Sequence, residues 1–98
     1  MLHLIVYDIS SDRIRNKVAE TLMEASFERL QLSVFLGLDN PQNNRRLWNK
    51  LNELLSAEPQ AKFYVIPLPK SSIKNMVSIG ENKLDIDYLT GDKDSLFI

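Results

Sequence analysis

The first segment of the chain is an apolar run from Leu2 to Ile9 that carries one carboxylate, Asp8, near its end. Its β-branched and aromatic residues predict a short strand, and apolar side chains at both odd and even positions indicate a central strand covered on both faces. Ser11 and Asp12 follow directly and can cap the N-terminus of a helix. The apolar positions of that helix recur at helical spacing and form one stripe: Ile14, Val18, Leu22 and Ala25.

Residues 27–38 alternate between apolar and other positions, which predicts β structure. The segment is longer than a typical strand, so a reversal near Ser33 should divide it into two consecutive strands. Asn40 and Pro41 predict the N-cap and first residue of a second helix, which should end near Leu55. The apolar side of this helix comprises Leu47, Trp48, Leu51, Leu54 and Leu55, and its outward side carries Arg45, Arg46 and Lys50.

A further strand is expected at residues 62–66, where Lys62 is followed by four apolar or aromatic residues. Pro67 and Pro69 should end this strand, because proline cannot donate to a central ladder. The next residues predict one helical turn at 71–75 and a short strand at 76–79.

Residues 81–91 are polar and predict a loop, whereas the chain ends in an apolar segment that predicts a terminal strand at 95–98. This strand is expected to dock on a neighbouring sheet, with contacts to a partner from Leu96, Phe97 and Ile98. We therefore expect one domain. Residues 1–80 form its core, and residues 81–98 form an acidic linker and C-terminal strand of the same domain.

The order of the predicted elements is β-α-β-β-α-β with an extra C-terminal strand, which is typical of the α+β ferredoxin-like fold. In that fold two helices cover one face of an antiparallel sheet and leave the other face open. The chain is small and its strands are largely apolar, so the open face needs a cover. The sequence therefore predicts a homodimer formed through this face.

The composition fits a small intracellular domain. The chain has 98 residues, of which 44% are hydrophobic and 26% are charged, and it has no cysteine for disulfides or thiolate metal sites. It also lacks a signal-peptide or membrane-span pattern, so a cytoplasmic location without membrane contact is expected.

The net charge is -1, but residues 81–98 carry -3 and residues 1–80 carry +2. A modestly basic body is compatible with a phosphate-facing surface, although an ordinary scatter of surface charges is the favoured interpretation.

Asp8 is the main candidate for chemistry, because it lies at a strand end where the backbone is rigid and water can enter. Three cations crowd the first turns of the following helix, namely Arg13, Arg15 and Lys17. The alternative interpretation is structural: Asp8 would end the strand and accept hydrogen bonds from the helix entry, and the cations would form a solvated helix face. His3 has no second ligand at metal-binding spacing, so we expect it to be a packed or edge residue.

Three motifs resemble those of the CRISPR-associated protein 2 family. They are Tyr7-Asp8-Ile9 at the end of the first strand, Arg15-Asn16-Lys17-Val18-Ala19 in the first helix, and the segment from Arg29 to Gly37. The resemblance covers about the whole chain. It implies a metal-dependent endoribonuclease or endonuclease. It also implies a dimeric bridge between two dimers of the CRISPR-associated integrase during spacer acquisition.

The resemblance also implies residue roles. Asp8 matches a metal-binding and catalytic aspartate, and Tyr7 its catalytic neighbour. Positions linked to activity or substrate contact are matched by Arg15, Lys17, Arg29, Ser33 and Phe35. Arg13 is a further candidate for nucleic-acid contact because of its charge and its place beside Arg15 and Lys17. The chain departs from the family pattern at three places: Ser11 stands where a second acidic residue is common, Lys17 where Arg is common, and Ser26 where Gly is usual. A lysine keeps the charge but loses the bidentate phosphate geometry of arginine.

A single carboxylate is a poor Mg²⁺ site, because the ion prefers several oxygen ligands. A two-fold axis beside the first strand would supply a second Asp8, and the pair would share one Mg²⁺ or Mn²⁺ ion. The competing class is a binding module without turnover, in which the dimer holds duplex DNA through phosphate contacts. A third hypothesis is a related toxin-type ribonuclease of the same fold, which is distinguished by whether the chain binds an integrase partner. The expected nucleic acid is duplex DNA or single-stranded RNA. The sequence does not decide between these functions. The preferred interpretation is the bridge as the biological role, with nuclease activity left open.

Overall fold

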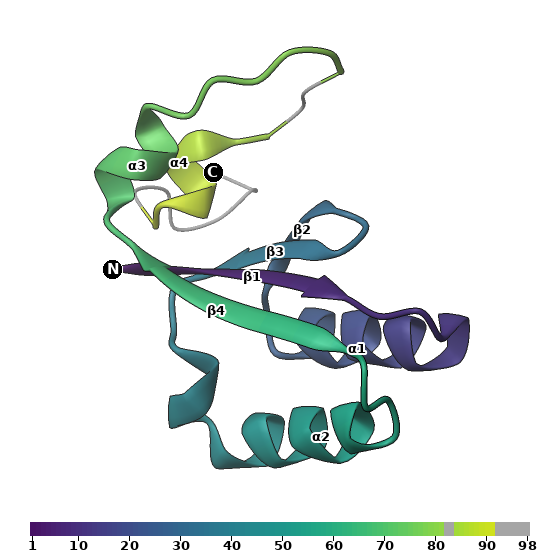
Figure 1. The fold of residues 1–98 in the computed structure, drawn as a ribbon. Helices are drawn as coiled ribbons and strands as arrows, with labels where there is room; N and C mark the ends of the chain where they lie inside the picture. Colours follow the sequence, from purple (N-terminus) through teal and green to yellow (C-terminus); the bar gives the residue numbers. More distant parts are fainter. Residues whose placement is uncertain (82–83, 92–98) are drawn as a thin grey trace.

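The computed structural model describes residues 1–81 and 84–91. Four strands form one antiparallel sheet in the order β2-β3-β1-β4, with β1 at Leu2–Asp8, β2 at Glu28–Gln31, β3 at Val34–Gly37 and β4 at Lys62–Leu68. Helices α1 (Asp12–Glu24) and α2 (Arg45–Ser56) follow β1 and β3, respectively. Figure 1 shows both helices against one face of the sheet. The predicted ferredoxin-like core and the central place of β1 are therefore confirmed.

Helix α1 begins where the sequence predicts. The side chain of Ser11 accepts a hydrogen bond of 3.3 Å from the backbone N–H of Ile14, and Asp12 lies in the first turn. A carboxylate there is favourable beside the positive end of the helix dipole. The predicted apolar stripe is also confirmed, since Ile14, Val18 and Leu22 are buried.

The end of α1 places Ser26 in a left-handed backbone conformation, with φ of 69°. The N–H of Ser26 donates to the Met23 carbonyl at 3.0 Å, and the N–H of Phe27 donates to the Leu22 carbonyl at 3.0 Å. These two bonds form a Schellman motif, in which glycine usually occupies the left-handed position. The serine that departs from the family pattern is therefore held in a conformation that glycine adopts more readily.

We expect Ser26→Gly to stabilise the chain by up to about 1 kcal/mol, because it removes the cost of a left-handed non-glycine residue. The gain is partly offset by the larger backbone freedom of glycine in the unfolded chain. Urea unfolding of both proteins measures the difference. Ser26→Ala is the control and should leave stability unchanged or lower it. A Ser26→Gly protein that is less stable than the parent would contradict the assignment of this cap.

The main core lies between the sheet and the helix layer. On β1, Ile5 and Tyr7 point toward the helices and are buried. Trp48 is half-buried against the same cluster and meets Phe63 edge to face at 6.4 Å between ring centroids. The prediction that Trp48 lies on the apolar, core-facing side of the second helix is therefore confirmed. The fully or largely buried members from the helices are Ile14, Val18, Ala19, Leu22, Leu47, Leu51 and Leu54.

The second helix starts later than predicted. Asn40 accepts a hydrogen bond from the Gln42 N–H at 3.0 Å, but it caps only the short 3-10 helix η1 (Pro41–Asn43). A second cap, Asn44, accepts from the Leu47 N–H at 3.1 Å and opens α2. Two capping residues four positions apart thus divide the expected helix into a single tight turn and a regular α-helix. The predicted outward side is confirmed, because Arg45, Arg46 and Lys50 are exposed.

The sequence predicts that the strand ends before Pro67, but the observed β4 does not end there. It continues to Leu68, and Pro67 lies opposite His3 in the β1–β4 register. The physical reason is that β4 is an edge strand, so a proline whose nitrogen points away from β1 removes no ladder bond. The residues before it, 62–66, form the predicted strand.

The segment after β4 differs most from the prediction. The helical turn is confirmed as α3 (Lys70–Lys74), but residues 76–79 form no strand, and Val77 and Ile79 are almost fully exposed. The expected loop at 81–91 contains a short helix, α4 (Ile86–Leu89), capped by Asp85. The predicted terminal strand at 95–98, with Leu96, Phe97 and Ile98, lies outside the described residues.

Helices α3 and α4 form a second, smaller core on the other side of the sheet (Figure 1). Ile73 of α3 and Leu89 of α4 pack with Leu2 and Leu36. This cluster covers one end of the face that α1 and α2 leave free. Within residues 1–81 and 84–91, no helix is long and apolar enough to cross a membrane.

Candidate functional site

The end of β1 presents two separate environments. Tyr7 and Asp8 are consecutive in an extended strand, so their side chains point to opposite faces of the sheet. Tyr7 faces the helix layer and is buried, whereas Asp8 lies on the other face and is exposed. The two residues that the sequence grouped as catalytic therefore do not share one cavity.

Tyr7 is enclosed by aromatic rings. Its ring stacks between Phe35 and Phe63, with centroids 6.1 Å away on each side, and only 4% of the residue is exposed. Its hydroxyl donates a hydrogen bond of 3.3 Å to the Leu32 carbonyl. Burial raises the pKa of Tyr7 above its ordinary value of 10.0, although the nearby charge of Arg29 opposes this shift. The phenol therefore stays protonated at neutral pH and acts as a hydrogen-bond donor.

Two arginines lie beside the Tyr7 hydroxyl. Arg29 donates to the same Leu32 carbonyl at 2.8 Å, and its guanidinium lies 5.4 Å from the centre of the Phe35 ring. Arg15 donates to the Ile9 carbonyl at 3.3 Å and forms an ion pair with Asp12. The structure thus brings together a group that we call the tyrosine cluster, which consists of Tyr7, Arg15, Arg29, Ser33 and Phe35.

The residues of the tyrosine cluster differ in how far they are exposed to solvent. Arg29 is exposed and Arg15 and Ser33 are half-buried, so these three can meet a ligand. Phe35 has no exposed surface, which does not fit the direct nucleic-acid contact implied by the resemblance; it packs under Tyr7 and Arg29 instead. Arg13 and Lys17 are exposed on α1, and neither is among the described residues that influence the Tyr7 hydroxyl.

Asp8 lies at the border of a surface cavity of about 530 Å³. The cavity is lined by the end of β1, the start of β4 and the connections next to them, and its lining includes Ser10, Gln60 and Lys62. Asp8 and Lys62 are directly opposite in the β1–β4 register. Sequence analysis missed Lys62 because its proximity to Asp8 depends on a pairing between distant segments.

The oxygen atoms around this cavity supply only part of the ligand set that a hard cation such as Mg²⁺ needs. Asp8 supplies a carboxylate, and Ser10 and Gln60 carry oxygen atoms, which are the ligand type that Mg²⁺ and Mn²⁺ prefer. In the part of the chain that the structure describes, no three His, Cys, Asp or Glu side chains gather into one potential metal site. Asp8 therefore fits one ligand position of such an ion, and the remaining ligands would have to come from outside the residues that the structure describes.

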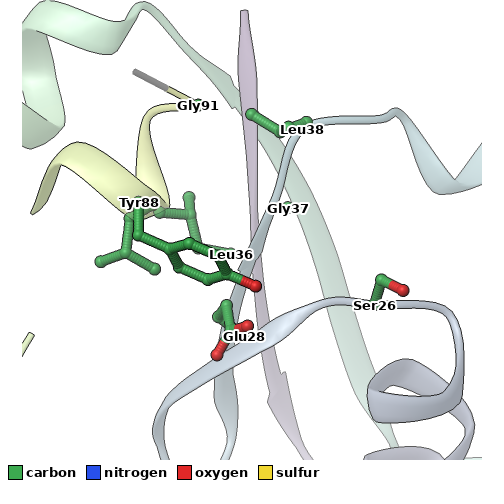
Figure 2. A pocket seen from close by; sticks show the side chains of 8 residues that line it. Ser26, Glu28, Leu36, Gly37, Leu38, Tyr88 and Gly91 are labelled. Carbon is green, nitrogen blue, oxygen red and sulfur yellow. The ribbon is translucent and has the colours of Figure 1, made fainter. Parts of the chain in front are cut away.

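A second cavity, of about 310 Å³, lies at the opposite end of the sheet (Figure 2). Tyr88 of α4 crosses Leu36 there, and its hydroxyl lies beside the carboxylate of Glu28. This carboxylate raises the pKa of the Tyr88 hydroxyl. Because Glu28 and Leu36 pair at the end of the hairpin away from Ser33, this cavity is separate from both Asp8 and the tyrosine cluster.

The sequence relatives point to one family. The family model described as CRISPR associated protein Cas2 matches residues 1–76. A protein of Pyrobaculum aerophilum named CRISPR-associated endoribonuclease Cas2 2 is 32% identical over 80 residues, which are 82% of this chain and 87% of that protein. CRISPR-associated endoribonuclease Cas2 1 of Archaeoglobus fulgidus is 30% identical over 88% of this chain and 90% of its own length.

The solved structures agree in fold. The crystal structure of Streptococcus pyogenes Cas2 at pH 6.5 matches with a TM-score of 0.63 at 18% identity and covers 82% of this chain and all of that one. A hypothetical protein of Thermus thermophilus, TT1823, matches with a TM-score of 0.65 at 28% identity, over 85% of this chain and 94% of that one. The match of the family model to most of the chain and the two relatives confirm the resemblance seen in the sequence: the chain belongs to the Cas2 family of CRISPR-associated proteins.

Proposed function

We propose that the chain is a metal-dependent nuclease that cleaves RNA phosphodiester bonds as a homodimer, with Asp8 as its ion ligand. The observation that carries this proposal is the exposed carboxylate of Asp8 at the rigid end of the central strand, beside a polar cavity. The names of the relatives, which call them endoribonucleases, support the reaction class.

The open face of the sheet supports the dimer. Asp8 lies on the same face of β1 as Leu4 and Val6, and Tyr64 and Ile66 of β4 are directly opposite those two residues. Tyr64 is 56% exposed and Ile66 is 39% exposed, so apolar surface remains uncovered here. A two-fold axis through this face would bury that surface and bring two copies of Asp8 toward each other.

Two carboxylates related in this way can hold one Mg²⁺ or Mn²⁺ ion together with phosphate oxygens and water. When bound, the ion supplies positive charge at the scissile phosphate and a more acidic water. The chain's own cations have a separate task. Arg15 and Arg29 are positioned beside the buried Tyr7 hydroxyl and can hold a neighbouring phosphate of the substrate.

We expect Ile66→Asp to prevent dimer formation, because a carboxylate would be buried opposite its own copy or left without a partner in an apolar interface. Sedimentation at micromolar concentration should show a dimer for the parent and a monomer for the variant. Met23→Asp is the matched control, since Met23 is 45% exposed on α1, away from the open face. A monomeric parent protein would contradict both the dimer and the shared ion.

A second candidate role is the bridge of the spacer-acquisition integrase, with duplex DNA held by phosphate contacts. The observation that favours it is the exposed position of Arg13 and Lys17 on α1, where they can meet a backbone without any metal ion. A pull-down with the integrase measures this role independently of cleavage. A toxin-type ribonuclease would cleave RNA but would not retain the integrase.

The test of the nuclease proposal is cleavage of end-labelled single-stranded RNA and duplex DNA, with Mg²⁺, with Mn²⁺ and with EDTA. The expected result is RNA cleavage that either ion supports and that EDTA stops. Cleavage that survives EDTA would contradict the metal-dependent reaction. A protein that retains the integrase and cleaves neither substrate would favour the bridge alone.

A further inference from the structure

The pairing of Asp8 with Lys62 places a cation next to the candidate ion ligand. Asp8 is the last residue of β1 and Lys62 the first of β4, and the two are Cα partners in the antiparallel ladder. Directly opposite residues project to the same face, with Cβ atoms about 4.5–5.5 Å apart. The Lys62 stem therefore starts beside the Asp8 carboxylate, although the two residues are more than fifty positions apart in sequence.

The lysine does not use this position to neutralise the aspartate. Both residues are exposed, and among the residues that the structure describes no ion pair joins their side chains. An exposed cross-strand charge pair contributes little to the stability of a sheet. The ammonium thus remains available to an anion from solution, and its flexible stem allows it to turn into the cavity.

The lining of the cavity matches a phosphodiester. Lys62 supplies an ammonium with three donors, Gln60 an amide and Ser10 a hydroxyl, all at the border of the same cavity of about 530 Å³. The side that carries these donors also carries Asp8, whose charge alone would repel a phosphate. A cation that belongs to the chain offsets that repulsion before and after an ion binds.

We propose that Lys62, together with Gln60 and Ser10, forms a phosphate subsite for the nucleic-acid backbone beside Asp8. This inference rests on the nuclease function proposed above and adds a substrate-binding residue to it. Lys62 contacts a phosphate in the ground state, so it contributes to substrate affinity without a bound metal ion. The subsite holds the backbone on the open-face side of β1, whereas Arg15 and Arg29 act on the helix side.

The test is binding of fluorescently labelled single-stranded RNA in EDTA, measured by anisotropy over a series of salt concentrations. Lys62→Gln should bind about fivefold to tenfold more weakly than the parent. Its slope of log affinity against log salt should be shallower by about 0.7, the change expected for one lost phosphate contact on a single strand. Lys62→Arg should keep most of the affinity. Lys50→Gln, an equal charge change on α2, should bind like the parent.

The outcomes separate the explanations. Unchanged RNA affinity in Lys62→Gln would overturn the subsite, and a lowered melting temperature in that case would assign Lys62 to sheet stability instead. An equal loss in Lys50→Gln would also overturn it, since the effect would then be general charge. If the parent cleaves RNA through Asp8 while Lys62→Gln binds normally, only the subsite fails. A parent that neither binds nor cleaves RNA overturns the nuclease proposal and this inference together.

Discussion

Asp8→Asn should lower metal-dependent RNA cleavage by at least about 100-fold. The amide keeps the size of the side chain but loses the charge that holds a divalent ion, and an ion contributes several kcal/mol to phosphoryl transition states. A loss of about 3 kcal/mol corresponds to roughly two orders of magnitude in rate. Initial rates with saturating Mg²⁺, measured on labelled RNA, give the comparison. Because Asp8 is exposed, the substitution should not disturb the core.

The same variant should dimerise at least as well as the parent. Two facing carboxylates repel each other without an ion, and asparagine removes that repulsion. Asp39→Asn changes the same charge at an exposed residue after β3 and serves as the activity control. Equal cleavage by the parent and Asp8→Asn would show that Asp8 is not an ion ligand. Asp8 would then be a structural strand end, as the alternative interpretation of the sequence holds.

Gly37→Ala should lower the free energy of unfolding by about 1–3 kcal/mol. Gly37 is the last residue of β3, and a Cβ atom there would lie 2.4 Å from two ring carbons of Phe27. Phe27 is itself buried, so the ring cannot move into solvent without opening the main core. For a domain of this size each kcal/mol shifts the melting temperature by about 4–8 °C, which thermal unfolding resolves.

A double variant identifies the cause of this loss. Phe27→Leu removes ring atoms that meet the added methyl group, so Gly37→Ala should cost less in the Phe27→Leu background than in the parent. Such non-additivity is expected only for residues in contact. Additive losses, or a Gly37→Ala protein that melts with the parent, would show that the backbone absorbs the methyl group without strain.

The regular part of the fold could be predicted because local signals agree there. The apolar stripe of α1, the Ser11 cap and the alternation on both sides of Ser33 each depend on residues close in sequence. Pro67 was misread because its tolerance depends on β4 lying at an edge, a property of the whole sheet. Helix α4 was missed because it has only four residues within a largely polar segment, and Leu89 gains its burial from the distant residues Leu2, Leu36 and Ile73.

The sequence proposes candidate site residues, whereas their arrangement follows only from the fold. The motif around Tyr7 and Asp8 directed attention to the end of β1, and the alternation of side chains along a strand implies that these two residues face opposite ways. What the sequence could not give is the partner strand. Lys62 became a neighbour of Asp8 only through the register of β1 with β4, and Leu32 became an acceptor for Tyr7 only through the turn between β2 and β3.

The position of β1 in the middle of the sheet also governs how the chain is made. This strand leaves the ribosome before either neighbour, and its edge-strand partner follows about 60 residues later, as the pairing of Leu4 with Ile66 shows. At about 5–20 residues per second this interval lasts several seconds. During that time an apolar strand has one unsatisfied edge, which is the kind of segment that chaperones bind. We therefore expect slower synthesis between β3 and β4 to lengthen the time for which this edge of β1 is unpaired.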